Sequence, residues 1–392
     1  MNITRLQADD YDALLNLLNE AFHEPPGRTF DLMLPAMWER DEEHMSRHVA
    51  IKEDGKVLAS VGIYPFRVVI GSQELTFATI GNVATSPECQ GKGYMSALLK
   101  TAVEEAEKMG IDVARLGGLR QRYNRFGFEN GGTGYQYTLT RRNLQEYYDG
   151  NLSHGEYLEQ NMTFQKLTME DKELLSFCFE LHQQAPMYVD RQNLRRFFKT
   201  LSAWKSEVWV AFSADGQPVG YLCAAPGKQE VSEHRGLTPE LEYRMLCQWI
   251  RAAEVEEIHF STAPWEVALN TAAGKICENW TVGITSHYQP FHWQKLMNAL
   301  LELKSQYSPI PEGQFTLEIE NYGVLAFEGK KCRLVAPEEA HEIDLKLSHL
   351  DAVRFLIGAL PTISVFEVPE HCRAYVSQTF PLPLWWCGQD RV

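Results

Sequence analysis

The stretch SPECQGKGYM, residues 86–95, separates two segments of opposite character. Before it, FATIGNVAT (77–85) is mostly apolar and β-branched, which is typical of a strand. After it, residues 96–110 carry apolar side chains at helical spacing, and Gly110 stands where a helix would end. The sequence therefore predicts a strand, a glycine-containing loop and a helix in direct succession.

The glycines at this junction predict an anion site. The first N–H groups of a helix lack partners within it and carry a partial positive charge, and glycine adopts backbone angles that other residues avoid. A P-loop is excluded because no hydroxyl residue follows the Gly-Lys pair, and a dinucleotide motif because Ser96 replaces the third glycine. The N–H groups that could converge on a pyrophosphate are those of Gly91, Lys92, Gly93, Tyr94 and Met95.

The segment 83–95, VATSPECQGKGYM, resembles the acetyl-CoA signature of the GNAT N-acetyltransferases, Q/R-x-x-G-x-G/A at a strand-to-helix junction. The resemblance rests on Gln90, Gly91 and Gly93, with the strand before them and the helix after them. It implies acetyl-CoA as the co-substrate. The cofactor-binding residues that it implies are Val83, Ala84, Thr85, Gln90, Gly91, Lys92, Gly93, Tyr94 and Met95.

A second segment, RYNRFGFE (122–129), is similar to the family's F/Y-Y-x-x-x-G-F element. The resemblance implies that Tyr123 is the general acid that protonates the departing CoA thiolate. A phenol suits this role because its reference pKa, about 10, exceeds the value of about 8.5 for a thiol. The alternative is that Tyr123 is a buried aromatic residue that packs against Phe126 and Phe128.

Part of the N-terminal pattern recurs later in the chain. HVAIKEDGKVLASVGIYP (48–65) and WVAFSADGQPVGYLCAAP (209–226) share Val-Ala, Asp-Gly and a final Pro in register. Hairpins with an Asp-Gly turn are common, so the residues alone leave open whether this is a true repeat or a chance likeness. Nothing in 227–262 resembles the Gln-Gly-Lys-Gly loop, so a second copy would lack the cofactor site.

The order of segments resembles the Eis (enhanced intracellular survival) family of acetyltransferases. The fold class expected is α/β (α+β), in three domains. These are a catalytic GNAT domain at 1–147, a degenerate GNAT-like domain at 160–288 and a sterol-carrier-protein-like domain at 289–392. The resemblance also implies a homo-oligomer, a trimer or a hexamer, and an amine substrate such as an aminoglycoside, a polyamine or a lysine.

The same resemblance implies a role for the end of the chain. In that family the C-terminal carboxylate reaches the active site as a general base, and here it would belong to Val392. The charged ending QDRV departs from the aromatic ending of many members. A frayed terminus is the alternative.

Composition limits the remaining classes. The net charge of −15 argues against nucleic acid as a partner. No apolar run reaches the ~18 residues of a membrane helix, and Asp9, Asp10 and Asp12 contradict a signal peptide, so a cytoplasmic protein is expected. Eight cysteines without C-x-x-C spacing predict no metal site, although His371 adjoins Cys372.

The acceptor is less well defined than the donor. We expect direct attack of a primary amine on the thioester in a ternary complex. Acidic residues interspersed with Phe22, Phe30 and Trp38 in segment 22–43 either hold a cation or form a solvated helix face. A non-catalytic acyl-CoA or lipid binding protein is the alternative function. The acidic residues of the segment are Glu24, Asp31, Glu39, Asp41, Glu42 and Glu43.

Overall fold

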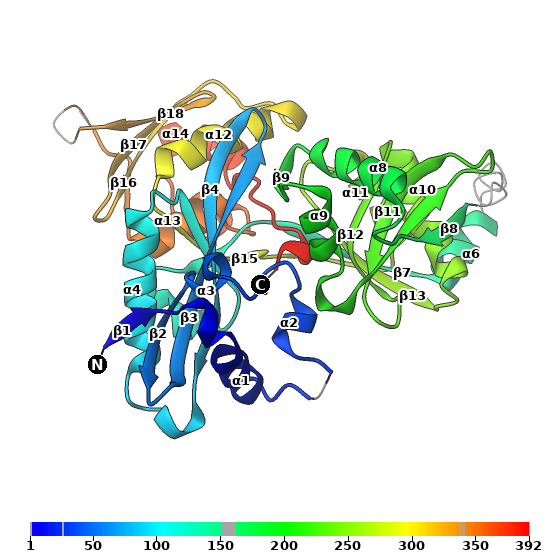
Figure 1. Cartoon of the computed structure of the whole chain (residues 1–392). Helices are drawn as coiled ribbons and strands as arrows, with labels where there is room; N and C mark the ends of the chain where they lie inside the picture. The colour runs from blue at the N-terminus through cyan, green and yellow to red at the C-terminus, as the bar shows by residue number, and fades with distance from the viewer. Residues whose placement is uncertain (1, 26, 150–161, 337–338, 340–341, 392) are drawn as a thin grey trace.

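The computed structural model describes residues 2–25, 27–149, 162–336, 339 and 342–391. It has the mixed α/β fold that the sequence predicted, and its strands form three sheets. Two of the sheets form separate halves of the molecule, and the third lies over the N-terminal half (Figure 1). The last residues of the chain run between the two halves (Figure 1).

The first sheet, sheet A, contains the predicted strand and most of the N-terminal residues. Its strands lie in the order β1-β2-β3-β4-β5-β15-β6, and β9 pairs with β3. Helix α4 (Tyr94–Lys108) covers one face, and α1 (Tyr11–Ala21) and α12 (Trp293–Tyr307) cover the other. The strands are β1 (Ile3–Arg5), β2 (His48–Glu53), β3 (Lys56–Ile70), β4 (Gln73–Thr85), β5 (Val113–Leu116), β6 (Glu129–Gly131), β9 (Met187–Val189) and β15 (Ser286–Pro290).

The second sheet, sheet B, packs α10 and α11 on one face, and α8 and α9 on part of the other. Its strands, in order, are β14 (Asn279–Gly283), β7 (Gly134–Thr140), β13 (Glu257–Thr262), β12 (Glu230–Gly236), β11 (Pro218–Ala224), β10 (Glu207–Phe212) and β8 (Thr163–Lys166). Its helices are α6 (Arg141–Asp149), α8 (Lys172–Gln183), α9 (Leu194–Leu201), α10 (Pro239–Ala252) and α11 (Val267–Ile276).

The third sheet, sheet C, has four strands and packs with α12, α13 and α14 around an aromatic core. The strands are β18 (Lys331–Val335), β17 (Gly323–Glu328), β16 (Gln314–Ile319) and β19 (Leu345–Leu347). The helices are α13 (His349–Ile357) and α14 (Glu370–Thr379), and the remaining short helices of the chain are α2 (Phe30–Met33), α3 (Glu42–Met45) and α5 (Arg120–Tyr123).

Sheets A and B exchange strands across the boundaries that the sequence suggested. The sequence suggested that the first domain ends at residue 147. Strand β7 lies before this boundary and helix α6 spans it, yet β7 pairs with β13 and β14 of sheet B, and α6 packs against α10 and α11. Strand β15 begins before the suggested boundary at 289 and ends just after it, at residue 290. It pairs with β5 and β6 in sheet A. Strand β9 likewise pairs with β3 of sheet A, although β8 before it and β10 after it belong to sheet B, so the described strands pass between the two sheets four times. The first and the last of these passages meet where the Thr285 N–H donates to the Gly131 carbonyl at 3.1 Å.

The two hairpins that share a sequence pattern occupy corresponding places. Strands β2 and β3 form an antiparallel pair in sheet A, and so do β10 and β11 in sheet B. In both sheets a third strand, a helix and a parallel strand follow, as β4-α4-β5 and as β12-α10-β13. The two sheets thus share an order of elements as well as a short sequence likeness.

A buried hydrogen-bonded chain fixes β4 at an irregularity. Ser60 faces Ala84 and Gly62 faces Gly81, so β4 bulges at Asn82, whose φ is 52°. The Asn82 amide donates to the Tyr64 hydroxyl, which lies 2.7 Å from His48 Nε2. Because His48 Nδ1 faces the Met45 carbonyl at 3.3 Å and a carbonyl only accepts, Nδ1 carries the proton and Tyr64 donates to Nε2.

This arrangement predicts a loss of stability in mild acid. Burial lowers the pKa of His48 from 6.5 to about 4, so the unfolded chain takes up this proton at a higher pH than the folded protein. Stability from this group is complete above pH 6.5 and falls as the pH drops towards 4, by on the order of 3 kcal/mol. Urea unfolding across this range measures the loss.

The variant His48→Gln should lose less stability than the wild type over the same pH range. The exposed His23 offers a matched control, and His23→Asn should retain the full pH dependence. His349 is partly buried, burial lowers its pKa to about 4, and it contributes equally to all three proteins. Identical pH dependence in His48→Gln and in the wild type would contradict the assignment.

Candidate active site

Strands β4 and β5 separate after a short stretch of pairing. Their parallel register contains Phe77 with Val113, Ala78 with Ala114, and Thr79 with Arg115. Beyond Thr79, β4 continues to Thr85 and pairs with β3 alone within the described residues. One edge of residues 80–85, which include Val83, Ala84 and Thr85, is therefore open to an extended ligand.

The glycine loop at the end of β4 has the backbone conformation of an anion cradle. Gly91 and Gly93 both have φ of 79°, and Gly93 is the residue that precedes α4. A Cβ atom at either glycine would find no other atom within 4 Å, so the left-handed backbone, not crowding, requires glycine there. The space above the loop is open.

The N–H groups of this loop are available to a ligand. Within the described part of the chain, no acceptor is in hydrogen-bond reach of the N–H groups of Gly91, Gly93, Tyr94, Met95 and Ser96. Lys92 differs, because its N–H faces the Cys89 carbonyl at 3.4 Å and its Nζ lies 3.5 Å from Cys89 Sγ. Gln90 is exposed at the start of the loop. The residues present thus fit a diphosphate group.

Tyr123 lies in the side-chain cluster on which residues of β4 and of the start of α4 pack. It is 6% exposed at the end of α5, and Val83, Tyr94 and Met95 pack on the cluster that contains it. Its ring covers Gly118, where an added Cβ would be 2.7 Å from Tyr123 Cε2. The phenol oxygen has no hydrogen-bond partner among the described residues. Phe126 and Phe128 belong to this cluster too, so a purely structural role for the ring is also compatible with the packing.

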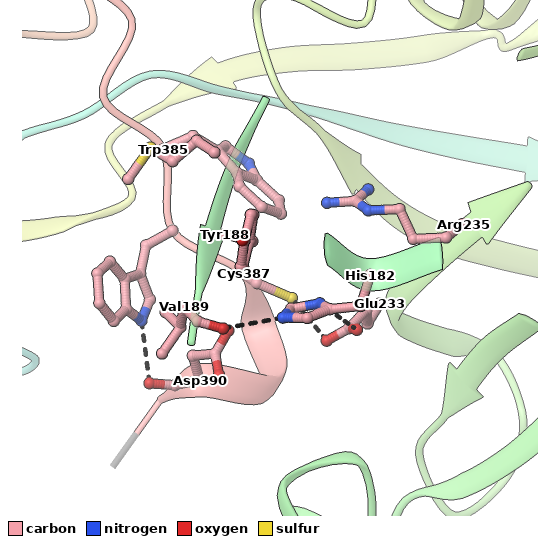
Figure 2. Close-up of a pocket in the computed structure, with 10 residues that line it drawn as sticks. His182, Tyr188, Val189, Glu233, Arg235, Trp385, Cys387 and Asp390 are labelled. Atoms are coloured by element: carbon pink, nitrogen blue, oxygen red, sulfur yellow. Dashed lines mark hydrogen bonds and ion pairs between the residues drawn. The ribbon is translucent and has the colours of Figure 1, made fainter. Parts of the chain in front are cut away.

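The last residues of the chain occupy the opposite face of the β4–β5 junction. We call residues 385–391 the tail; Val392 lies outside the described residues. The indole of Trp386 stacks on Phe77 of β4, with centroids 5.7 Å apart and planes at 21°. The Arg115 guanidinium lies over the same indole at 4.3 Å. The indole N–H donates to the Asp390 carbonyl at 2.9 Å, a contact drawn as a dashed line in Figure 2.

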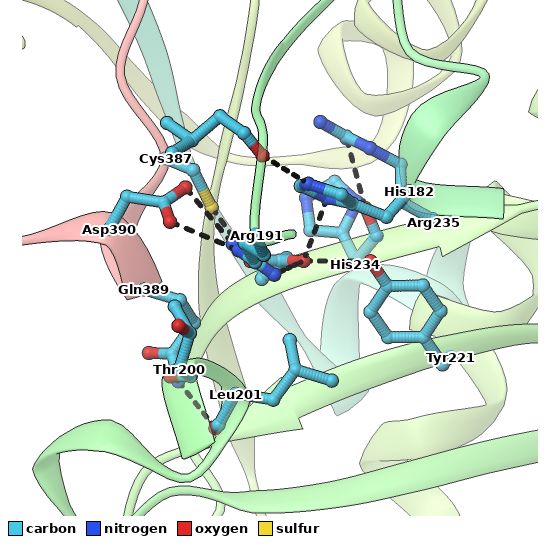
Figure 3. Close-up of polar contacts among 12 residues, drawn as sticks. His182, Arg191, Thr200, Leu201, Tyr221, His234, Arg235, Cys387, Gln389 and Asp390 are labelled. Carbon is cyan, nitrogen blue, oxygen red and sulfur yellow. Dashed lines mark hydrogen bonds and ion pairs between the residues drawn. The ribbon is translucent and has the colours of Figure 1, made fainter. Parts of the chain in front are cut away.

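A buried ion cluster holds the tail from the other side. Arg191 Nε and Nη2 each donate to Asp390 at 3.0 Å, while Arg191 Nη1 and Nη2 donate to Glu233 at 3.0 and 2.5 Å (Figure 3). The side chains of Arg191 and Glu233 are each 1% exposed. Tyr221 donates to Glu233 at 2.7 Å, and the Cys387 thiol donates to the other oxygen at 3.0 Å.

The charges of this cluster depend on one another. Burial alone would raise the pKa of Glu233, but the charge of Arg191, with hydrogen bonds from His182 and Arg191, holds it well below the usual value. Burial likewise opposes the charge of Arg191, and the two carboxylates outweigh it, so its pKa lies well above the usual value. Burial, then the charge of Glu233, raises the pKa of the Cys387 thiol, which therefore stays protonated. Sequence reasoning missed this cluster, because nothing in the residues near Arg191 marks that arginine as buried.

An open pocket lies between the tail and the uncovered face of sheet B. Its volume is about 780 Å³. The indoles of Trp204, Trp280 and Trp385 contribute to its lining, and Glu230 and Arg391 supply charges of opposite sign. This pocket beside the tail is formed by residues that are distant in the sequence, and its volume is within the range of small-molecule sites.

The acidic segment 22–43 is largely engaged in contacts of its own. Glu39 pairs with Lys199 at 2.6 Å, and Asp41 caps α3 through the His44 N–H. Trp38 is buried, which removes it from the surface. Asp31 differs, because its buried Oδ1 has no partner among the described residues. Of the segment's charges, Asp31 fits best the predicted role of holding a cation.

The His371–Cys372 pair acquires one further potential metal ligand, Asp344. His371 Nε2 lies 2.6 Å from Asp344 Oδ1, while Asp344 Oδ2 accepts from the Thr316 N–H at 2.7 Å. Burial raises the pKa of the Cys372 thiol to about 11. These contacts account for the three side chains as part of the packing of sheet C and α14.

Comparisons with known proteins agree with this geometry. Residues 2–131 match the family described as an acetyltransferase (GNAT) domain. No curated protein matches the sequence significantly. None of the helices in the described part of the chain is long and apolar enough to span a membrane.

Several solved structures share the fold over the whole chain. A GCN5-related N-acetyltransferase from Kribbella flavida has a TM-score of 0.70 at 15% identity, covering 100% of this chain and 98% of that one. A conserved Enterococcus faecalis V583 protein of unknown function, described as a probable N-acyltransferase, has a TM-score of 0.66 at 16% identity, covering 98% and 97%. Eis1 from Mycobacterium abscessus has a TM-score of 0.66 at 12% identity, covering 99% of each chain.

At these identities the structural likeness concerns the fold, and the family match concerns residues 2–131. That segment contains the glycine loop, the open edge of β4 and Tyr123. The match to an acetyltransferase (GNAT) domain confirms for residues 2–131 the enzyme class predicted from the sequence, an acetyl-CoA-dependent N-acetyltransferase.

Proposed function

We propose that the chain transfers the acetyl group of acetyl-CoA to a primary amine by direct attack within a ternary complex. The observation that carries this proposal is the set of unpaired N–H groups of Gly91, Gly93, Tyr94, Met95 and Ser96 beside the open edge of β4. The glycine loop and Lys92 hold the pyrophosphate, with Gln90 at its entrance. The edge of β4 at Val83, Ala84 and Thr85 holds the pantetheine arm by backbone hydrogen bonds.

The reaction requires two proton movements. The amine nitrogen forms a bond to the thioester carbon, the carbon–sulfur bond breaks, and Tyr123 gives its phenol proton to the departing thiolate. The amine loses a proton to a base, for which we propose the terminal carboxylate of Val392. The described tail supports this assignment, because Trp386 stacks on the face of β4 opposite α4 and the Asp390 carbonyl accepts from Arg115 of β5.

We also propose that a second, degenerate GNAT-like unit follows the first, with bounds that differ from those expected from the sequence. Sheets A and B share the order hairpin, strand, helix and parallel strand, which supports a second, degenerate GNAT-like unit in residues 134–283. Its α10 is capped by Thr238 and begins at Pro239, without the Gln-Gly-Lys-Gly loop that precedes α4, which supports one donor site per chain. We retain as predictions a sterol-carrier-like domain over 289–392, homo-oligomers and a cytoplasmic location.

The alternative, a lipid or acyl-CoA carrier, would need a cavity in the C-terminal unit. Aromatic side chains pack against one another there. The rings of Phe315 and Phe355 stack with centroids 5.4 Å apart, and Phe327 meets Phe380 at 5.1 Å. A filled aromatic core favours a scaffold over a carrier.

An assay for free CoA thiol, with acetyl-CoA and a panel of polyamines, aminoglycosides and lysine peptides, tests the proposal. Transfer predicts thiol release that depends on the amine, together with an acetylated product in the mass spectrum. Release of no thiol across the panel, with tight retention of acyl-CoA, would favour the carrier.

We predict that Gly93→Ala weakens acetyl-CoA binding because alanine resists the left-handed conformation that aims the loop's N–H groups. Gly110, at the other end of α4, has φ of 73° and equally open surroundings, so Gly110→Ala is the matched control. Both changes should cost about 1 kcal/mol of stability. Only Gly93→Ala should raise the Kd for acetyl-CoA in calorimetry, and equal affinity in the two variants would argue against the cradle.

For Tyr123→Phe we expect kcat to fall by roughly 10²-fold, because the thiolate loses its proton donor while the ring still fills its place. The Kd for acetyl-CoA should stay near that of the wild type. Steady-state kinetics with one reactive amine measures the effect. A kcat equal to that of the wild type would leave Tyr123 only its packing role.

A further inference from the structure

Arg191 is far from the end of the chain in the sequence, and it binds the last described turn of the chain. It follows β9, the short strand that pairs with the far end of β3. Its guanidinium bonds to Asp390 of the tail and to Glu233 of β12 (Figure 3). No residue of the glycine loop or of α5 takes part. The cluster of Arg191, Asp390 and Glu233 is therefore separate from the proposed donor site and from Tyr123.

We infer that Arg191 is a positioning residue for acetyl transfer, which fixes the tail as the acceptor-side wall of the site through Asp390 and Glu233. This inference rests on the proposed transferase function. It concerns residues 385–391, all of them described.

The geometry of the cluster specifies a single arrangement of the tail. The guanidinium offers donors on two edges, so Nε and Nη2 meet Asp390 while Nη1 and Nη2 meet Glu233. A lysine ammonium, a single point of charge, could not bond both carboxylates in this planar way. A buried ion cluster of this kind contributes little net stability compared with apolar packing, but it is costly to leave incomplete. Its effect is to define where Asp390 sits.

Contacts on both sides of the tail transmit this position to sheet A. Gly388 has space for no side chain, since an added Cβ would be 2.8 Å from the Ser232 carbonyl oxygen. Gln389 donates to the Leu201 carbonyl at 2.6 Å. Across the tail, the Asp390 carbonyl accepts from Trp386 and from Arg115, the β5 residue at the point where β4 and β5 separate. Fixing the Asp390 side chain therefore fixes its carbonyl against β5.

The tail and the donor site lie on opposite faces of β4. Phe77, which stacks on Trp386, points away from the α4 face, whereas its neighbour Ala78 packs in the α4 cluster. An amine that approaches the thioester from the side opposite α4 must pass the tail. The pocket of about 780 Å³ is lined by Gly388, Gln389 and Arg391 on that side. Release of the tail should therefore disturb acceptor binding and attack and leave donor binding intact.

The variants Arg191→Lys and Asp390→Asn test this separation. The matched control is Asp112→Asn, which alters another buried carboxylate. Asp112 accepts from Lys295 at 2.6 Å and from the Thr76 N–H at 2.8 Å, at the opposite end of β5 from the tail. Circular dichroism and thermal melts establish that each variant is folded at the assay temperature and measure the stability lost.

We expect Arg191→Lys and Asp390→Asn to lower kcat/KM for the amine by about 10- to 100-fold, while the Kd for acetyl-CoA changes less than about twofold. Carboxypeptidase should remove the end of these two chains faster than that of the wild type. Asp112→Asn should lose comparable stability but keep its kcat/KM for the amine and its resistance to carboxypeptidase.

Three results would overturn the inference. These are full kcat/KM in Asp390→Asn, an equal loss in Asp112→Asn, or a parallel loss of acetyl-CoA affinity in the Arg191 variant. If the wild type transfers acetyl to no amine, the proposed function fails by itself. The carboxypeptidase comparison then still decides whether Arg191 holds the tail.

Discussion

The early end of the pairing between β4 and β5 is the constraint on which the rest of the site depends. Parallel strands normally hold each other along their length, but here the pairing stops at Thr79 and Arg115. The bulge at Asn82, held by Tyr64 and His48, gives β4 a fixed course beyond that point. A gap edged by rigid backbone results, with one face towards α4 and the other towards the tail.

Different kinds of interaction act on the two faces of this gap. On the α4 face, left-handed glycines and a helix N-terminus present N–H groups that only an external acceptor can satisfy. On the other face, aromatic stacking on Trp386 and the two carboxylates on Arg191 hold a segment that is itself part of the chain. The proposed donor side therefore consists of groups that a ligand can bind, whereas the proposed acceptor side is built by contacts between distant residues. This division explains why a short sequence motif identifies the donor and no motif identifies the acceptor.

The sequence predicted the local elements and missed the long-range ones. Helical spacing after residue 95, Gly110 and the Asp-Gly hairpins are encoded within a few residues, and each appears as expected. Strand exchange could not be read in this way, because the alternation within 134–140 or 286–290 indicates a strand but not its partner. Arg191 and Asp390 are charged residues in polar surroundings in the sequence, which usually indicates the surface. Their burial depends on each other and on Glu233, three positions that only the tertiary fold brings together.

Hydrogen–deuterium exchange with and without acetyl-CoA tests most directly the central claim that each chain has one donor site, in the first sheet. The account predicts slower exchange in residues 83–96 on adding acetyl-CoA. It predicts no change in residues 232–246, the corresponding strand and helix of the second sheet. Protection of 232–246, or unchanged exchange in 83–96 at saturating acetyl-CoA, would contradict it.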